Sequence, residues 1–155
     1  MAQKNTKIMA LDIGAARTGV AMTDELLITA QPVTTIEHKT LKELFSGIKS
    51  LIMGNNVGKI IIGYPKELDG REGEKAGQIA KLSRKLHAFL QAQRLSSPSS
   101  GDIEIILWDE RLTTCQAEKI VIGTKLKNKA KSAALDRVSA AIILESYLNS
   151  TKNAK

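Results

Sequence analysis

The chain has 155 residues, 43% of them hydrophobic, so it is long enough for one globular domain with a sizeable core. No apolar run approaches the roughly 20 residues of a membrane span, and no signal-peptide pattern opens the chain. The single cysteine excludes an internal disulfide. We therefore expect a cytoplasmic protein without a membrane partner. Lys and Arg number 23 against 16 Asp and Glu, and the net charge of +7 favours a nucleic-acid partner over a basic composition with no specific partner.

Five segments have the composition of strands. The short connections between the first three predict an antiparallel meander, and Pro32 places the third strand at an edge or at a bulge. The last two are rich in Ile and Leu, as strands covered on both faces are. The predicted strands span residues 7–13, 18–23, 28–36, 58–65 and 102–110.

Amphipathic patterns predict helices between and after these strands, and Thr40 with Glu43 fits a capping box before the first helix. The predicted helices span residues 41–52, 74–93, 113–122 and 132–149. We expect a loop at 94–101 and a lysine-rich mobile segment at 124–132. The order of elements predicts a mixed sheet with helices on its faces, a single α/β domain over residues 1–155 with flexible tails at 1–6 and 150–155.

Asp12 is a carboxylate near the end of a strand that otherwise looks buried. Because side chains alternate along a strand, Asp12 lies on an apolar face, where an unpaired charge costs several kcal/mol. Its partner is Arg17, a ligand or a metal ion, since ligand sites of α/β sheets gather at such strand ends. The alternative is that Asp12 caps a tight turn through the amides of Gly14 or Ala15.

Two other elements bring carboxylates to similar places. Asp109 and Glu110 end the last strand, and because consecutive strand residues face opposite ways, one of the two enters a site with Asp12. Asp136 lies on a face of the last helix that is otherwise apolar or small. Its alternatives are stabilisation of the helix dipole and delivery inward toward the strand ends.

Three carboxylates gathered in one place repel one another unless divalent cations lie between them. Two Mg²⁺ or Mn²⁺ ions about 4 Å apart, held by carboxylate oxygens, form a recurring site for cleaving phosphodiesters. In a basic chain this combination predicts a nuclease.

Four motifs follow one another along the chain: "LDIGAARTGVAMTD", "IIIGYPKELDGREG", "DERLTT" and "LDRVSAAIILESYL". Together they resemble the YqgF (RuvX-like) family of the ribonuclease H-like superfamily, whose members are described as Holliday junction resolvases or as nucleases that finish the end of pre-16S ribosomal RNA. The resemblance implies a five-stranded ribonuclease H-like sheet with its first three strands antiparallel and a divalent-metal site. It also implies catalytic, metal-binding carboxylates at Asp12, Glu110 and Asp136, and so favours Glu110 over Asp109.

Basic residues near these motifs are candidates for contacts with substrate phosphates. Arg17 follows the first strand, and its alternative role is to pair with Asp24. The pair Ala15–Ala16 stands where the family pattern leads us to expect Thr-Lys, which removes one lysine contact. The expected substrate-binding residues are Arg17, Lys66, Arg71, Arg111, Lys127 and Lys129.

These features predict a nuclease that uses Mg²⁺ or Mn²⁺ and acts on nucleic acid, either pre-rRNA or branched DNA, as a monomer or a homodimer. Maturation of the pre-16S rRNA end is the favoured function, and Holliday junction resolution is the alternative. A third reading is a non-catalytic rRNA-binding assembly factor. The opening "LDIG" also resembles actin-like ATPases and sugar kinases, but those need two lobes to enclose a nucleotide, and 155 residues supply one.

Overall fold

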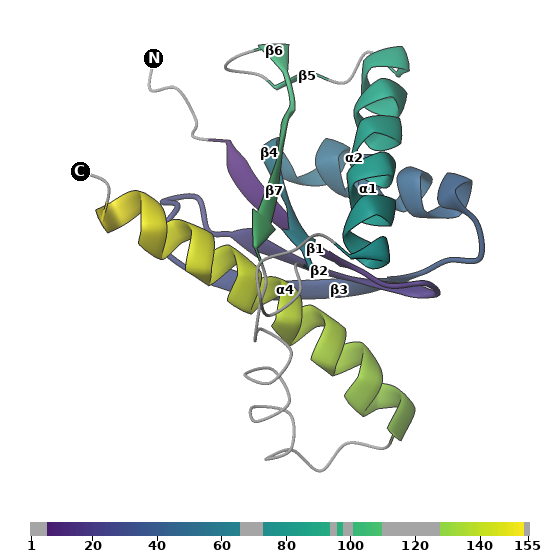
Figure 1. Cartoon of the computed structure of the whole chain (residues 1–155). Helices are drawn as coiled ribbons and strands as arrows, with labels where there is room; N and C mark the ends of the chain where they lie inside the picture. The colour runs from purple at the N-terminus through teal and green to yellow at the C-terminus, as the bar shows by residue number, and fades with distance from the viewer. Residues whose placement is uncertain (1–5, 66–72, 94–95, 98–100, 110–127, 154–155) are drawn as a thin grey trace.

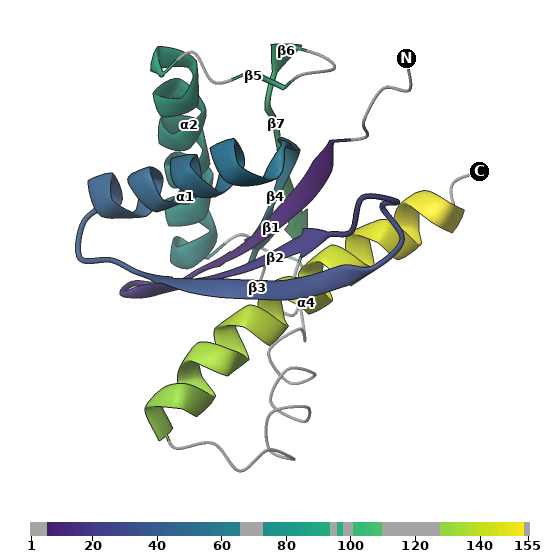
Figure 2. The same ribbon diagram turned by 180° about the vertical axis from the view of Figure 1, so that it is seen from behind.

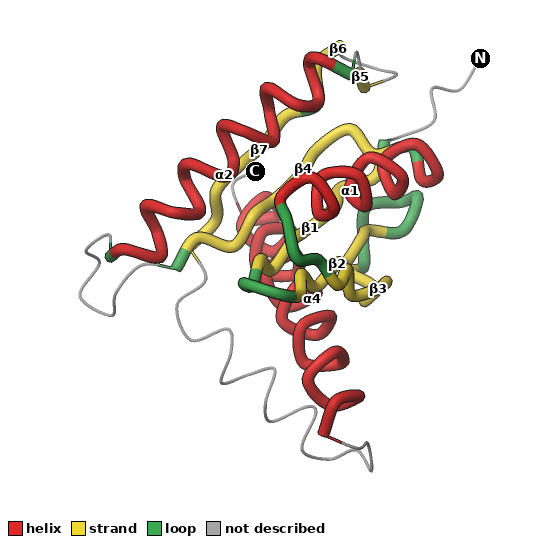
Figure 3. Tube along the Cα trace, turned by 90° about the vertical axis from the view of Figure 1, so that its right-hand side faces the viewer, coloured by secondary structure: helices red, strands yellow, loops and turns green. Residues whose placement is uncertain are grey.

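The computed structural model describes residues 6–65, 73–93, 96–97, 101–109 and 128–153. The ribbon has three layers, with α1 and α2 on one face of a central sheet and α4 on the other (Figures 1 and 3). The elements are β1 (Lys7–Ile13), β2 (Arg17–Thr23), β3 (Ala30–Glu37), α1 (Leu41–Asn55), β4 (Val57–Tyr64), α2 (Glu74–Ala92), β5 (Ser96–Ser97), β6 (Gly101–Asp102), β7 (Glu104–Asp109) and α4 (Asn128–Asn153).

The main sheet has five strands in the order β3-β2-β1-β4-β7. The first three pair antiparallel, while β4 pairs parallel with β1 and with β7. This confirms the predicted mixed sheet and its antiparallel meander. Pro32 lies on the edge strand β3 at a register shift, because Val20 pairs with Thr34 and Ala21 pairs with Pro32. Proline fits both places, since it cannot donate to a ladder.

The bounds of the last helix and the segment at 94–101 differ from the prediction. Residues 128–132 of the lysine-rich segment are helical, because α4 spans Asn128–Asn153, and the same helix includes residues 150–153 of the expected tail. No Gly or Pro stands at either end of the predicted range to stop the helix there. The segment at 94–101, expected as a loop, contributes Ser96–Ser97 and Gly101 to a small antiparallel sheet, β5–β6. The helix expected at 113–122 lies outside the described residues.

The alternation of β1 divides the core into two clusters. Met9, Leu11 and Ile13 pack on the side of α1 and α2. Ile8 and Ala10 pack on the opposite side, against apolar residues of α4. Asp12 follows this second parity, which puts it on the predicted face with Ile8 and Ala10, and α4 covers that face. Figure 2 shows the same arrangement from behind, with α4 crossing β1, β2 and β3.

Among the described helices, none has the length and apolarity to span a membrane.

His38 follows β3 and is buried beside the start of β2. Its Nε2 lies 2.9 Å from the Thr18 hydroxyl, and its amide donates to the Ala16 carbonyl at 3.0 Å. Burial lowers the pKa of His38 from its ordinary value of 6.5, against a smaller opposite effect of the Glu43 charge. Because the unfolded chain binds this proton more readily than the folded chain, stability present above pH 6.5 is lost as the pH falls through the folded pKa.

We expect His38→Gln, which keeps a polar side chain for Thr18, to reduce this acid sensitivity. The measurement is urea unfolding of both proteins between about pH 7 and about pH 5. The free energy of unfolding should fall less steeply in the variant than in the parent chain. Parallel curves would show that His38 does not carry the effect.

Candidate active site

The site begins with a row of residues across three strands. Asp12 of β1 pairs with Gly19 of β2, and Gly19 pairs with Thr35 of β3. Helix α4 crosses this row in close contact, because a Cβ on Gly19 would overlap the backbone carbonyl of Asp136. The Thr35 hydroxyl also donates to the Ala133 carbonyl at 2.8 Å. The missing side chain at Gly19 therefore lets α4 bring Asp136 to the end of the sheet that carries Asp12.

Asp136 forms an ion pair with Arg17, the first residue of β2. Arg17 Nε donates to Asp136 Oδ2 at 2.9 Å, and the two side chains are 39% and 21% exposed. The structure thus places Arg17 beside the carboxylates, but its partner is Asp136. The alternative pairing of Arg17 with Asp24 is wrong, since Asp24 Oδ1 accepts from the amides of Ile28 and Thr29 at 2.8 and 3.1 Å.

The environment of Asp12 disfavours its charged form. Burial, and then the negative charge of Asp136, raise the pKa of Asp12 from 3.8 to about 6. The positive charge of Lys75 and a hydrogen bond with the buried side chain of Ser139 act in the opposite direction. The turn-capping alternative requires the amide of Gly14 or Ala15 to donate to Asp12. The Gly14 amide instead donates to the Arg17 carbonyl at 2.9 Å.

Strand β7 gives the direction of one of the two candidate carboxylates at its end, Asp109. Ile105 and Leu107 pack on the side of α1 and α2, whereas Ile106 and Trp108 pack on the side of α4. Asp109 follows the parity of Leu107 and so faces away from α4. Its neighbour in the ladder is Tyr64, which belongs to the cluster under α1 and α2.

The remaining predicted site residues are not placed by the structure. Glu110, Lys66, Arg71, Arg111 and Lys127 lie outside the described residues. Lys129 lies in α4, at a position where only the backbone is described.

Sequence reasoning missed three residues of the site: Gly19, Lys75 and Ser139. Ser139 had a usable signal, since it follows Asp136 by three positions and so shares its helix face. The sequence signal for Gly19 was weaker: a glycine inside a strand often marks a close approach of another backbone. Lys75 lies in the first turn of α2, on another element, and no local pattern connects it with Asp12.

The donor set fits a hard divalent cation. Asp12 and Asp136 supply carboxylate oxygens, which suit Mg²⁺ and Mn²⁺. The raised pKa of Asp12 reflects, in part, a repulsion from Asp136 that a cation would relieve. Within the described residues no three His, Cys, Asp or Glu side chains form a metal-binding group, and the expected third ligand, Glu110, lies outside them.

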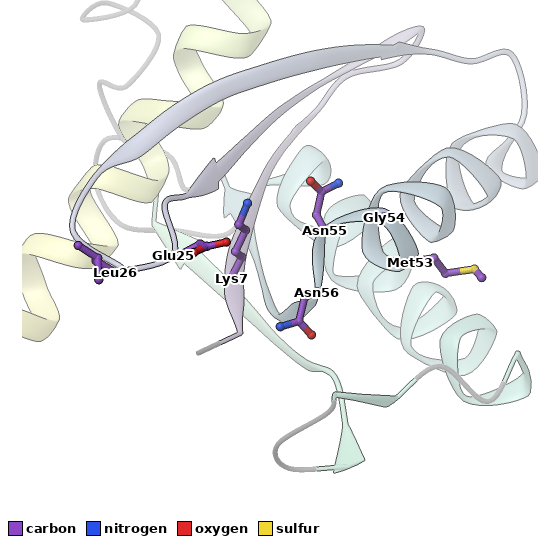
Figure 4. Close-up of a pocket in the computed structure, with 7 residues that line it drawn as sticks. All are labelled: Lys7, Glu25, Leu26, Met53, Gly54, Asn55 and Asn56. Atoms are coloured by element: carbon purple, nitrogen blue, oxygen red, sulfur yellow. The ribbon is translucent and has the colours of Figure 1, made fainter. Parts of the chain in front are cut away.

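Two surface pockets lined by described residues lie elsewhere. One, of about 450 Å³, surrounds Lys7 at the start of β1, with Glu25 and Leu26 on one side and Asn55 and Asn56 on the other (Figure 4). The second, of about 510 Å³, lies between α2 and the start of β7. Neither pocket is lined by a residue that the sequence predicted for the site.

Comparison with known proteins identifies the family. The model of the RuvX family, described as "Holliday junction resolvase", matches residues 6–150. The chain belongs to this family. The four sequence motifs had indicated the same family, so that prediction is confirmed.

Relatives of this RuvX-family chain carry the name "Putative pre-16S rRNA nuclease". One from Halothermothrix orenii is 40% identical over 143 residues, which cover 92% of this chain and 94% of the relative. Another from Syntrophus aciditrophicus is 38% identical over 149 residues, which cover 96% of this chain and 92% of the relative. The match therefore extends over nearly the whole length of each protein.

The fold is also found in a solved resolvase. The structure described as Fowlpox virus resolvase and substrate Holliday junction DNA complex aligns with a TM-score of 0.55 at 15% identity. The alignment covers 94% of this chain and 99% of the viral chain. Together with the strand order, this confirms the predicted ribonuclease H-like fold.

Proposed function

We propose that this chain is a divalent-metal-dependent nuclease that acts on the precursor of 16S ribosomal RNA. The observation that carries the proposal is the pair of carboxylates, Asp12 and Asp136, on one face of the sheet beside the cation Arg17. A charged pair of this kind suits a metal that works on a phosphodiester. The names of the relatives supply the substrate class.

The residues of the chain then have separate roles. Asp12, Glu110 and Asp136 would hold Mg²⁺ or Mn²⁺, two ions when substrate is bound. Such ions polarise the phosphodiester and lower the pKa of bound water. The direction of Asp109, away from α4, supports Glu110 as the third ligand. Ser139 orients Asp12 through its hydrogen bond, and the β2–α4 contact at Gly19 fixes the position of Asp136.

The substrate is bound mainly through its phosphates. The net charge of +7 supports this mode, and so does the ion pair of Arg17 with Asp136, which puts one predicted phosphate-binding residue beside a carboxylate. The other proposed contacts come from Lys66, Arg71, Arg111, Lys127 and Lys129. With a ribosomal RNA precursor as substrate, the protein would act in the cytoplasm, as a single-domain monomer or homodimer.

Holliday junction resolution is the second candidate, because the family model carries that description. A resolvase must cut two strands symmetrically, so it requires a dimer. An RNA-end nuclease can act as a monomer. The oligomeric state in solution therefore helps to separate these two functions.

The test offers the full chain a pre-16S rRNA fragment and a four-way DNA junction, each with Mg²⁺ or Mn²⁺ and with a chelator. We expect cleavage of the RNA near the mature end, only with metal, and binding that weakens steeply as salt rises. Symmetric cleavage of the junction alone would favour the resolvase. RNA binding without cleavage under any metal would contradict the nuclease and favour an assembly factor.

A further inference from the structure

The contact between Arg17 and Asp136 occupies one of the two oxygens that Asp136 could offer to the proposed metal site. Arg17 Nε lies 2.9 Å from Asp136 Oδ2, well within ion-pair distance. The pair joins the start of β2 to α4, and it uses one nitrogen and one oxygen. It therefore lacks the second hydrogen bond of the tightest arginine–carboxylate pairs.

The charges around this contact show why a cation lies there. Asp12 and Asp136 are close enough for the charge of Asp136 to raise the pKa of Asp12. Two cations oppose this negative pair among the described residues: Arg17, in contact with Asp136, and Lys75, through its charge. Without a metal ion, Arg17 is the only cation that forms a salt bridge with either carboxylate in the described part of the chain.

We infer that Arg17 is a built-in counter-ion of the metal site, which pairs with Asp136 in the metal-free chain and releases it when a divalent cation binds. This inference rests on the proposed function, and it assigns Arg17 a second role there. The Arg17 side chain is already 39% exposed, so once released it can turn to a substrate phosphate without crossing the core. Metal binding and phosphate binding are then coupled, because each favours the open Arg17.

If Arg17 and a metal ion compete for Asp136, the removal of Arg17 should change the affinity for the metal in a definite direction. In Arg17→Gln the competing charge is absent, so Mn²⁺ should bind the metal-free chain more tightly, by about tenfold for one charge near a partly exposed site. The same variant should be less stable without metal, since Asp136 then lacks its salt-bridge partner and its repulsion with Asp12 is less well balanced. Arg17→Lys keeps the charge and should bind Mn²⁺ with nearly the parent affinity. Calorimetric titration without nucleic acid measures all three affinities.

A spectroscopic measurement follows Arg17 itself. In ¹H–¹⁵N spectra, the Nε–H signal of Arg17, assigned by its loss in Arg17→Lys, should shift and exchange faster with water when Mg²⁺ is added. Arg84→Gln is the matched control, because it removes one arginine charge from the second pocket, between α2 and β7. Its Mn²⁺ affinity should equal that of the parent chain.

Each outcome has one meaning. Tighter Mn²⁺ binding in Arg17→Gln, together with the Mg²⁺-dependent Nε–H shift, supports the counter-ion. Equal or weaker binding in Arg17→Gln would overturn it and would leave Arg17 as a residue that positions Asp136. Absence of Mn²⁺ binding to the parent and to every variant would overturn the proposed metal site as well.

Discussion

Asp12→Asn is expected to stabilise the metal-free protein and to abolish both metal binding and cleavage. The parent chain keeps a carboxylate in a site that disfavours its charge, as the rise of its pKa from 3.8 to about 6 shows. At about 1.4 kcal/mol for each pKa unit, this rise corresponds to roughly 3 kcal/mol of destabilisation at neutral pH, as an upper estimate. Asparagine removes the charge and keeps an oxygen that can accept from Ser139.

The pH dependence gives the sign of the effect. The folded chain binds the Asp12 proton more tightly than the unfolded chain, so this contribution to stability is fully present below pH 3.8. It is lost as the pH rises through about 6. In a chelator, the free energies of unfolding of parent and Asp12→Asn should therefore diverge over this range, with the variant the more stable at neutral pH.

Metal titration separates this expectation from the turn-capping role. If Asp12 only capped the turn, Asp12→Asn would lose about 0.5–2 kcal/mol of stability and would keep its affinity for Mg²⁺ and Mn²⁺. Asp109→Asn is the matched control, since it removes a carboxylate on the opposite face of the sheet. We expect Asp109→Asn to retain metal binding, and retained binding in Asp12→Asn would end the assignment of this site.

The parts of the site that sequence could predict are those with a local period. The two-residue repeat of β1 places Asp12 on the face of Ile8 and Ala10, and the structure shows that α4 packs on this face. The helical repeat of the last helix likewise places Asp136 on the packed face, and Ala140 lies in the same cluster as those two residues. A periodic pattern relates residues within one element, so the sequence could predict that Asp12 and Asp136 lie on the packed faces of their elements.

Contacts between elements that are far apart in the sequence follow no periodic pattern. The partner of Arg17 is 119 positions away on α4, whereas Asp24, the nearer acid, satisfies two amides of its own turn. Sequence proximity therefore suggested the wrong partner. The choice between Asp109 and Glu110 came from the family resemblance, and the structure adds only the direction of Asp109.

Gly19 is the residue whose replacement should disturb the site most without touching its chemistry. A Cβ at this position would overlap the carbonyl of Asp136 and would lie 2.9 Å from the amide nitrogen of Arg137. Both obstacles are backbone atoms of α4, which cannot move as a single side chain can. In Gly19→Ala the helix must therefore shift away from β2, and the Thr35–Ala133 hydrogen bond, now 2.8 Å, must lengthen or break.

We expect Gly19→Ala to lower the free energy of unfolding by about 3 kcal/mol or more, at or above the upper end of overpacking in cores. Because Asp136 moves with α4, Mn²⁺ affinity should fall as well, although Gly19 supplies no ligand.

Gly77→Ala is the matched control, since Gly77 lies in α2, where an added Cβ would meet no atom within 4 Å. It should gain roughly 0.5–1 kcal/mol from helix propensity and leave Mn²⁺ binding unchanged. Urea unfolding and calorimetric titration of the two variants test the contact directly. Equal stability of Gly19→Ala and the parent chain would mean that α4 does not approach β2 as closely as the site requires.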